Sequence, residues 1–227
     1  MNDVTINNII KNNLVFFTLF LIFLLLAQFF LWHNHIQGEE IFWLDAQRKS
    51  FLDIIFQFFT LVGEAYSFVI AFFVLLFFEY RKAILIPIAG GLNLIITYFS
   101  KHYLAHPRPM TYFNQLHIFE KLHPVEGVDL NSGFNSFPSG HTLAAFTLFS
   151  LLALLSENKT RNAVIFFSSA ALVAVSRMYL IQHFLEDVLL GSIVGTSIAT
   201  AVFYFYKNTE IAAESKWNQH LKTRKLN

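Results

Sequence analysis

Long apolar runs dominate the chain, and polar residues gather in short stretches between them. A run of roughly 20 apolar residues is long enough to cross the hydrocarbon core of a bilayer as a helix. We count six such blocks, the second assembled from two adjoining stretches and the fourth short. They cover residues 14–32, 51–62 with 65–78, 83–99, 143–155, 163–181 and 184–206. The pattern predicts an all-α polytopic membrane protein with six transmembrane helices in one bundle.

Composition supports the membrane interpretation. The chain is 55% hydrophobic and only 14% charged, whereas soluble domains carry about 25% charged residues. Six apolar runs would leave a soluble helical protein too little polar surface. The first block exceeds the roughly 7–15 apolar residues of a signal peptide, and no small-x-small cleavage site follows it, so we expect it to be retained.

The distribution of Lys and Arg predicts the orientation, because cytoplasmic segments carry an excess of these residues. With the N-terminus inside, the inner segments hold Lys11, Arg81, Lys82, Lys159, Arg161, Lys207, Lys216, Lys222, Arg224 and Lys225, and the outer segments hold Arg48, Lys49, Lys101, Arg108, Lys121 and Arg177. The bias predicts that both termini are cytoplasmic. The basic tail, residues 207–227, is either a plain topology signal or a contact with anionic lipid of the inner leaflet.

The chain is expected to form a single domain, residues 1–227, since we find no linker, repeat or low-complexity tract. Two outer loops are long, residues 33–50 and 101–141, and a long loop in so compact a chain indicates function. Gly191 and Gly195 stand four apart, a spacing that predicts close helix packing within the chain. The net charge of +1 gives no field for nucleic acid, and the absence of Cys excludes disulfides and thiolate chemistry.

Ionisable residues beside membrane spans are costly and usually functional. Here they form three groups, all predicted at the outer face. The groups are Lys101 with Arg108, then Pro138-Ser139-Gly140-His141, then Ser176-Arg177 with His183 and Asp187. Their convergence predicts a site at the outer membrane–water interface.

The residue types in this predicted site suit a phosphate group. Arg matches phosphate oxygens with a planar fork, and Lys adds a point charge. Ser139 and Gly140 precede a helix, whose free N–H groups attract anions. A carboxylate four residues after His183 can fix one ring nitrogen and leave the other free to attack. His141 can protonate a leaving alkoxide.

The spacing of these residues resembles the type 2 phosphatidic acid phosphatase (PAP2) superfamily. The chain reads Lys101-x6-Arg108-Pro109, Pro138-Ser139-Gly140-His141 and Ser176-Arg177-x5-His183-x3-Asp187, complete and in family order over residues 101–187. The resemblance implies that phosphate is bound by Lys101, Arg108, Ser139, Gly140 and Arg177. It also implies a phosphohistidine on His183, oriented by Asp187, with His141 protonating the leaving group.

These observations predict a membrane lipid phosphatase or diphosphatase of the bacterial inner membrane, with a lipid phosphate as substrate and no cofactor. Undecaprenyl diphosphate, phosphatidylglycerophosphate, phosphatidate and lipid A 1-phosphate all remain open, as does the oligomeric state. Specificity is expected in the loop at residues 110–135. The alternatives are a phosphotransferase that uses another acceptor and a non-enzymatic anion transporter.

Metal catalysis is a further alternative, which we do not expect. The candidate histidine pairs are His33 with His35, His102 with His106, and His117 with His123. Only the second pair has ligand spacing, and no carboxylate or third histidine stands at a defined offset from it.

Because His183 must be neutral and His141 protonated, a bell-shaped pH profile is predicted.

Overall fold

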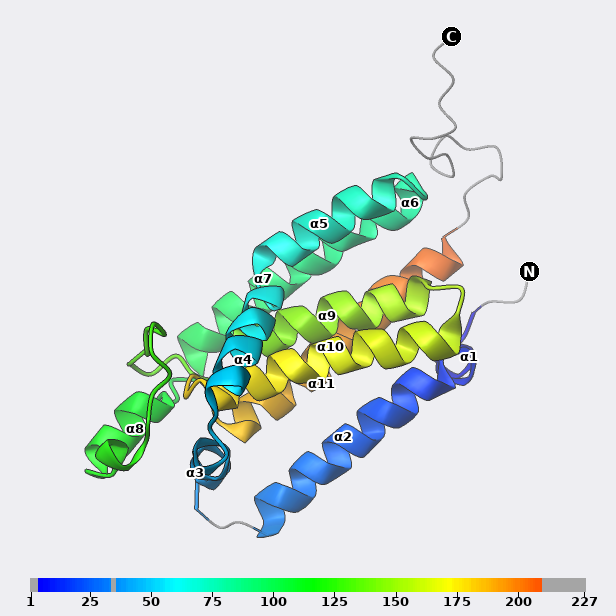
Figure 1. Cartoon of the computed structure of the whole chain (residues 1–227). Helices are drawn as coiled ribbons and strands as arrows, with labels where there is room; N and C mark the ends of the chain where they lie inside the picture. The colour runs from blue at the N-terminus through cyan, green and yellow to red at the C-terminus, as the bar shows by residue number, and fades with distance from the viewer. Residues whose placement is uncertain (1–3, 34–35, 210–227) are drawn as a thin grey trace.

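A computed structural model describes residues 4–33 and 36–209, and this part of the chain is helical with no strand (Figure 1). Residues 210–227, most of the predicted basic tail, and His35 lie outside the described residues. The helices are α1 (Ile6–Asn12), α2 (Leu14–His33), α3 (Glu39–Ala46), α4 (Ser50–Val62), α5 (Ala65–Leu76), α6 (Tyr80–Ala83), α7 (Leu85–Tyr103), α8 (Pro109–Gln115), α9 (Gly140–Leu155), α10 (Lys159–Tyr179) and α11 (Leu185–Asn208), with a 3-10 turn η1 (Phe119–Lys121).

Each predicted apolar block is helical, but not every block is long enough to be a span by itself. Within residues 4–33 and 36–209, four helical segments are long and apolar enough to cross a bilayer, namely α2, α6 with α7, α10 and α11. The α4–α5 pair makes a fifth if its two parts, bent by 63°, are one span. At 16 residues, α9 is about 24 Å long, so the sixth span remains a prediction.

The short helix α9 is central in the bundle, and it packs most extensively against α11 and α10 (Figure 1). Small residues allow this close approach. A Cβ placed on Gly195 would lie 2.5 Å from the carbonyl oxygen of Leu143, and one on Gly191 would lie 2.9 Å from that of Ser139. The prediction that this glycine pair serves internal packing is confirmed.

The bend between α4 and α5 brings the chain close to α9 and α10. A Cβ on Gly63 would lie 2.7 Å from the Cγ1 of Val173 and 3.2 Å from the Cβ of His141. Any side chain larger than the hydrogen of glycine would therefore clash with α9 and α10 at this position. The next residue, Glu64, precedes α5 and lies beside the start of α9.

The three motifs meet at one end of the bundle. The end of α7, the start of α9 and the turn between α10 and α11 lie there, beside α8 and α3 (Figure 1). At the opposite end, Val4 exchanges hydrogen bonds with the Asn208 side chain, of 2.9 and 3.0 Å. All the candidate site residues are thus far from α1.

Candidate active site

Backbone contacts bring the motif segments together. The Ser139 N–H donates to the Asp187 carbonyl at 3.0 Å. An isolated bridge joins His106 to Asn135, which places the segment before Arg108 beside the segment before Ser139. The turn after α10 is closed by the Gln182 and His183 N–H groups, which both donate to the Arg177 carbonyl, at 2.9 and 3.2 Å.

The turn that carries His183 is conformationally unusual. Ile181 has a φ of 57° and is fully buried, and a β-branched residue is rarely found in the left-handed region. Such backbone strain persists where surrounding structure enforces it, and it is common at functional sites. The turn therefore fixes the position of His183 ahead of α11.

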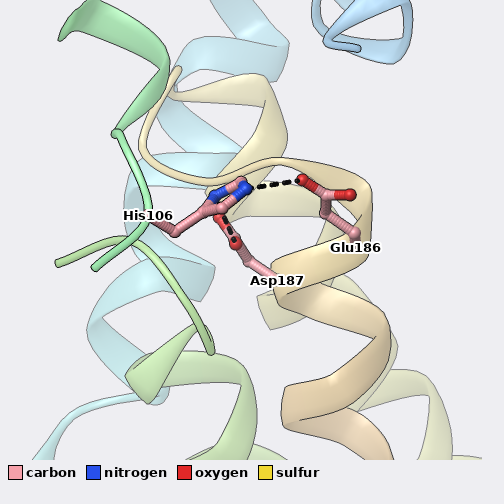
Figure 2. Close-up of side chains that lie close together, drawn as sticks. All are labelled: His106, Glu186 and Asp187. Atoms are coloured by element: carbon pink, nitrogen blue, oxygen red, sulfur yellow. Dashed lines mark ion pairs between the residues drawn. The ribbon is translucent and has the colours of Figure 1, made fainter. Parts of the chain in front are cut away.

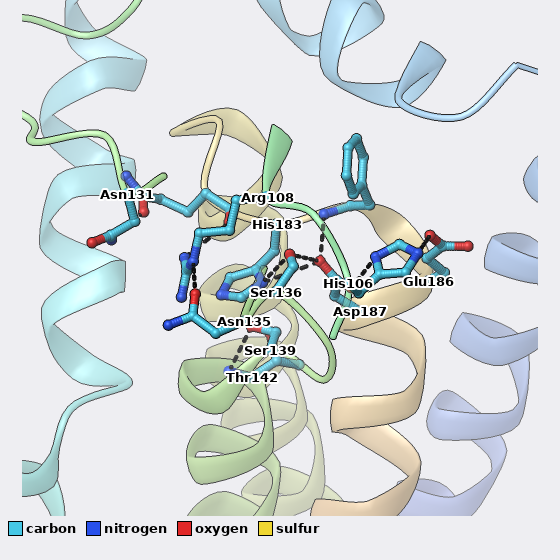
Figure 3. A network of polar contacts seen from close by, with 12 residues as sticks. His106, Arg108, Asn131, Asn135, Ser136, Ser139, Thr142, His183, Glu186 and Asp187 are labelled. Carbon is cyan, nitrogen blue, oxygen red and sulfur yellow. Dashed lines mark hydrogen bonds and ion pairs between the residues drawn. The ribbon is translucent and has the colours of Figure 1, made fainter. Parts of the chain in front are cut away.

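Asp187 holds His183 by one nitrogen. The Nδ1 of His183 lies 3.1 Å from the Oδ2 of Asp187, which also accepts the Phe184 N–H at 2.9 Å and the Ser136 hydroxyl at 2.5 Å (Figure 3). Because α11 begins at Leu185, the contact is made across the helix N-terminus and not along one helix face. Nδ1 carries the proton donated to Asp187, and Nε2 is left with its lone pair.

Burial keeps the ring of His183 neutral. The residue is 1% exposed. Burial lowers its pKa to about 4, with Arg177 and Arg108 acting in the same direction and Asp187 opposing them. A neutral imidazole at physiological pH is the form that can act as a nucleophile.

Cations surround this histidine. Arg108 is buried, and its guanidinium donates to the Asn135 side chain at 2.7 Å and to the Gln182 carbonyl at 3.3 Å (Figure 3). Burial lowers the pKa of Arg108. Arg177 is also buried and donates to the Thr60 hydroxyl, while its Nε has no hydrogen-bond partner in the part of the chain that the structure describes. Three gathered cations, with Lys101 the third, repel one another, so a bound anion would stabilise the group.

The start of α9 completes the cradle, and the predicted Ser139 lies at its N-cap. The hydroxyl of Ser139 accepts from the Thr142 N–H at 3.4 Å and from the Thr142 hydroxyl at 3.0 Å, which leaves its own proton to donate. A Cβ on Gly140 would lie 3.7 Å from the Nζ of Lys101. The helix amides and the lysine therefore face the same space.

His141 is the second residue of α9 and lies beside Glu64. Its Nε2 is 3.6 Å from the Oε1 of Glu64, and its side chain is 31% exposed. The structure thus brings together all eight residues predicted from the sequence. Their arrangement can bind a phosphoryl group beside two histidines, of which His183 is buried and His141 is partly exposed.

A largely apolar groove leads away from His141. It has a volume of about 740 Å³ and runs between α5 and α7. Its walls include Phe68, Phe72, Leu94 and Gly91, and Gly140 with His141 closes one end. An apolar chain attached to the bound phosphate could lie in it.

Several polar neighbours of the site were not singled out from the sequence. Ser136 contacts Asp187, Asn135 contacts Arg108, Thr60 contacts Arg177, and Glu64 contacts His141. Asn135 and Ser136 belong to the segment "NSFPSGH". The many polar residues in this segment could have indicated that these two also belong to the site. Thr60 and Glu64 stand in an apolar stretch distant in sequence.

The histidine pairs considered for metal binding form no group of potential ligands in the described residues. His123 instead pairs with Asp45 at 2.9 Å, and His102 stacks on Tyr98. Within residues 4–33 and 36–209, the structure groups His106 with Glu186 and Asp187 (Figure 2). His106, from the second pair, therefore has carboxylate neighbours that are distant in sequence.

Comparison with known proteins adds a family and a fold. The sequence profile of the PAP2 superfamily matches residues 82–211. LpxE of Aquifex aeolicus has a similar structure, with a TM-score of 0.61 and 25% identity over 73% of this chain and 93% of that one. The transmembrane PAP2 type phosphatidylglycerolphosphate phosphatase of Bacillus subtilis gives a TM-score of 0.62 and 25% identity over 84% and 95%. A search of curated proteins finds no significant match.

Proposed function

The chain belongs to the PAP2 superfamily, and we propose that it is a membrane lipid phosphatase that works through a phosphohistidine on His183. The observation that carries this proposal is the state of His183, which is buried, neutral and held by Asp187 through Nδ1 inside a group of three cations. A cradle for an anion alone would need the cations but not an oriented nucleophile. This feature favours an enzyme over a transporter.

The first chemical step forms the phosphohistidine. Phosphate binds to Lys101, Arg108 and Arg177 and to the start of α9, and the Nε2 of His183 attacks phosphorus. The bond from phosphorus to the lipid oxygen breaks, and His141 gives its proton to the departing oxygen. Charge that develops on the phosphoryl oxygens is stabilised by the fixed cations and amides. Glu64 is placed to hold the His141 ring during this transfer.

The second step restores the enzyme. His141, now neutral, takes a proton from water as the water oxygen attacks phosphorus. The phosphorus–nitrogen bond breaks, its electrons return to Nε2, and inorganic phosphate leaves. Asp187 keeps its contact with Nδ1 throughout and stabilises the positive charge on the phosphorylated ring.

The groove supports an amphiphilic substrate. Its apolar walls end at His141, the residue proposed to protonate the leaving oxygen. The solved relatives point in the same direction, since one of them is described as a phosphatidylglycerolphosphate phosphatase.

We propose that the site faces outward from a bacterial inner membrane. Undecaprenyl diphosphate, phosphatidylglycerophosphate, phosphatidate and lipid A 1-phosphate are the candidate substrates.

A turnover panel tests this function. Purified protein in detergent is given each of these four lipids, and inorganic phosphate and dephosphorylated lipid are quantified. We expect release from at least one lipid, no release by His183→Ala, and normal release by His102→Ala, whose ring stacks on Tyr98 of the same helix. Both variants are checked by thermal unfolding. If a phosphorylated second product forms in place of free phosphate when alcohols are added, the protein is a phosphotransferase.

A further inference from the structure

A second group of potential ligands lies beside the phosphate cradle. His106, Glu186 and Asp187 form what we call the outer cluster (Figure 2). The Nε2 of His106 is 3.5 Å from the Oε1 of Glu186, and its Nδ1 is 4.0 Å from the Oδ1 of Asp187. One ligand atom from each residue can be chosen so that all lie within 4.8 Å of one another. The mechanism above uses neither His106 nor Glu186.

One oxygen of Asp187 faces this cluster without a hydrogen bond. Ser136, Phe184 and His183 all contact Oδ2, and Asp187 is 0% exposed. Among the described residues, its buried Oδ1 has no hydrogen-bond partner, and neither does the buried Nδ1 of His106. A buried carboxylate oxygen without a donor is costly. A cation is one ligand that would satisfy it.

The other two side chains are held in place and reachable. The His106 carbonyl accepts the Ser136 N–H at 3.1 Å, and the ring packs against Phe137 and Phe184. Glu186 accepts from the Gln37 side chain at 2.5 Å. Supporting contacts of this kind preorganise metal ligands. The side chains of His106 and Glu186 are 35% and 39% exposed, which gives an ion a route in.

We propose that the outer cluster binds one divalent transition-metal cation of the Zn²⁺ class. One imidazole and two carboxylates are ligands that such ions accept, and their two negative charges balance the ion. A tetrahedral ion with bonds of about 2.0–2.2 Å keeps its ligand atoms roughly 3.3–3.6 Å apart. The 3.5 and 4.0 Å separations involve different ring nitrogens of His106, and one ligand atom from each residue lies within 4.8 Å of the others. The side chains must therefore rotate to bring a single imidazole nitrogen and the two carboxylate oxygens to that spacing.

The bound cation would inhibit the enzyme. It takes electron density from Asp187, whose other oxygen orients His183, and so weakens the nucleophile. The cation also competes with Lys101 and Arg108, whose charges already act on Asp187. Occupancy therefore depends on the metal concentration. This consequence rests on the proposed function, whereas the binding site itself does not.

Metal binding is measured first, without reference to activity. Chelator-treated protein in detergent is titrated with ZnCl₂ by calorimetry, and bound zinc is counted after dialysis. We expect one site in the wild type, lost in both His106→Ala and Glu186→Gln and retained in the matched histidine control His102→Ala. Zinc binding that is absent in the wild type, or unchanged in both cluster variants, would overturn the proposal.

Inhibition is measured on the same proteins. We expect EDTA to leave wild-type turnover unchanged, zinc to reduce it, and His106→Ala to need at least about tenfold more zinc for the same loss. Equal zinc sensitivity of wild type and His106→Ala would overturn the inhibitory role. If no lipid phosphate is hydrolysed by the wild type but the zinc site is lost in both variants, the metal site stands and the proposed function fails.

Discussion

At the scale of single residues, Asp187 joins the chemistry of the site to the fold. Its Oδ2 caps the start of α11 through the Phe184 N–H and accepts from Ser136 as it holds His183. Its carbonyl accepts the Ser139 N–H, at the start of α9. One residue thereby ties the proposed nucleophile to the proposed phosphate cradle. Changes to its partners should alter catalysis more than they alter folding.

The pH dependence should report the neutral state of His183. Protonation of Nε2 stops the attack, so activity should fall as pH drops through the pKa of His183, which burial lowers to about 4. An unperturbed histidine would already have lost about tenfold in rate near pH 5.5. The measurement is kcat/KM for a lipid phosphate from about pH 3.5 to 9. The second ionisation of the substrate phosphate, at about pH 6, is titrated separately and subtracted. With chemistry rate-limiting, a remaining acid limb near 6.5 would contradict this assignment.

The Ser136 hydroxyl should matter through Asp187. Ser136→Ala removes the donor that lies 2.5 Å from Oδ2, and a buried carboxylate that loses a donor is destabilised by about 1–3 kcal/mol. We expect kcat to fall about tenfold with KM little changed, because the substrate does not contact this hydroxyl. Ser197→Ala on the exposed face of α11 is the matched control. Unchanged kcat in a folded Ser136→Ala protein would exclude this positioning role.

The candidate site residues could be predicted from the sequence where their chemistry differs from that of the surrounding apolar blocks. Lys101, Arg108, Ser139, Gly140, His141, Arg177, His183 and Asp187 stand out because charge and turn residues are rare beside apolar blocks, and the structure gathers them. Thr60, Glu64 and Glu186 could not be found this way. Their roles depend on which helices pack side by side, and a single polar residue in an apolar stretch does not reveal that.

At the scale of elements, the contact between α9 and α11 sets the geometry of the site. The α11 glycines let the two helices approach until only backbone and Cβ atoms separate them. Close approach of this kind stabilises helix pairs in membranes, where the hydrophobic effect between helices is weak. Since α9 begins with Gly140 and His141, and α11 begins two residues after His183, their packing positions both histidines.

Enlarging Gly195 should destabilise this pair. In Gly195→Ala the new Cβ would lie 2.5 Å from the Leu143 carbonyl oxygen and 2.9 Å from the Cβ of Phe146. The backbone must shift, so we expect a loss of about 1–3 kcal/mol. Thermal unfolding in detergent measures it.

The matched control is Gly91→Ala in α7, where an added Cβ meets no described residue within 4 Å. Helix propensity alone should stabilise that variant by about 0.5–1 kcal/mol. Equal unfolding temperatures of the two variants would show that the close α9–α11 contact does not carry the stability argued here.

Helix positions followed well from the apolar blocks, because the boundaries of α2, α7 and α11 fall where polar residues interrupt the runs. Two features did not follow. The bend of 63° between α4 and α5 depends on Gly63 fitting against Val173 and His141, which is a tertiary contact. The short helices α3 and α8 lie in loops whose sequence shows no apolar period.

At the scale of the whole molecule, the groove and the cradle share Gly140 and His141. Polar chemistry lies at one end of the bundle, and the apolar space between α5 and α7 opens beside it. A lipid phosphate needs both features at once, with its phosphate among cations and its chain among Phe side chains. A water-soluble phosphate needs only the first.

Filling the groove should therefore separate the two substrate types. Gly91→Leu places a side chain into the space beside Leu94. We expect KM for a long-chain lipid phosphate to rise about 3- to 10-fold, with hydrolysis of p-nitrophenyl phosphate unchanged. Ser197→Leu, on an exposed face away from the groove, is the control. If both substrates respond equally, the groove does not hold the lipid chain.

The central claim is that a lipid phosphoryl group passes through His183. The most direct test mixes the purified protein with a lipid labelled with ³²P at its terminal phosphate, quenches in alkali within milliseconds, and maps the labelled peptide. Phosphohistidine survives alkali, so the account predicts label on His183 in the wild type and none in His183→Ala. Label on a different residue, or full turnover by His183→Ala, would contradict it.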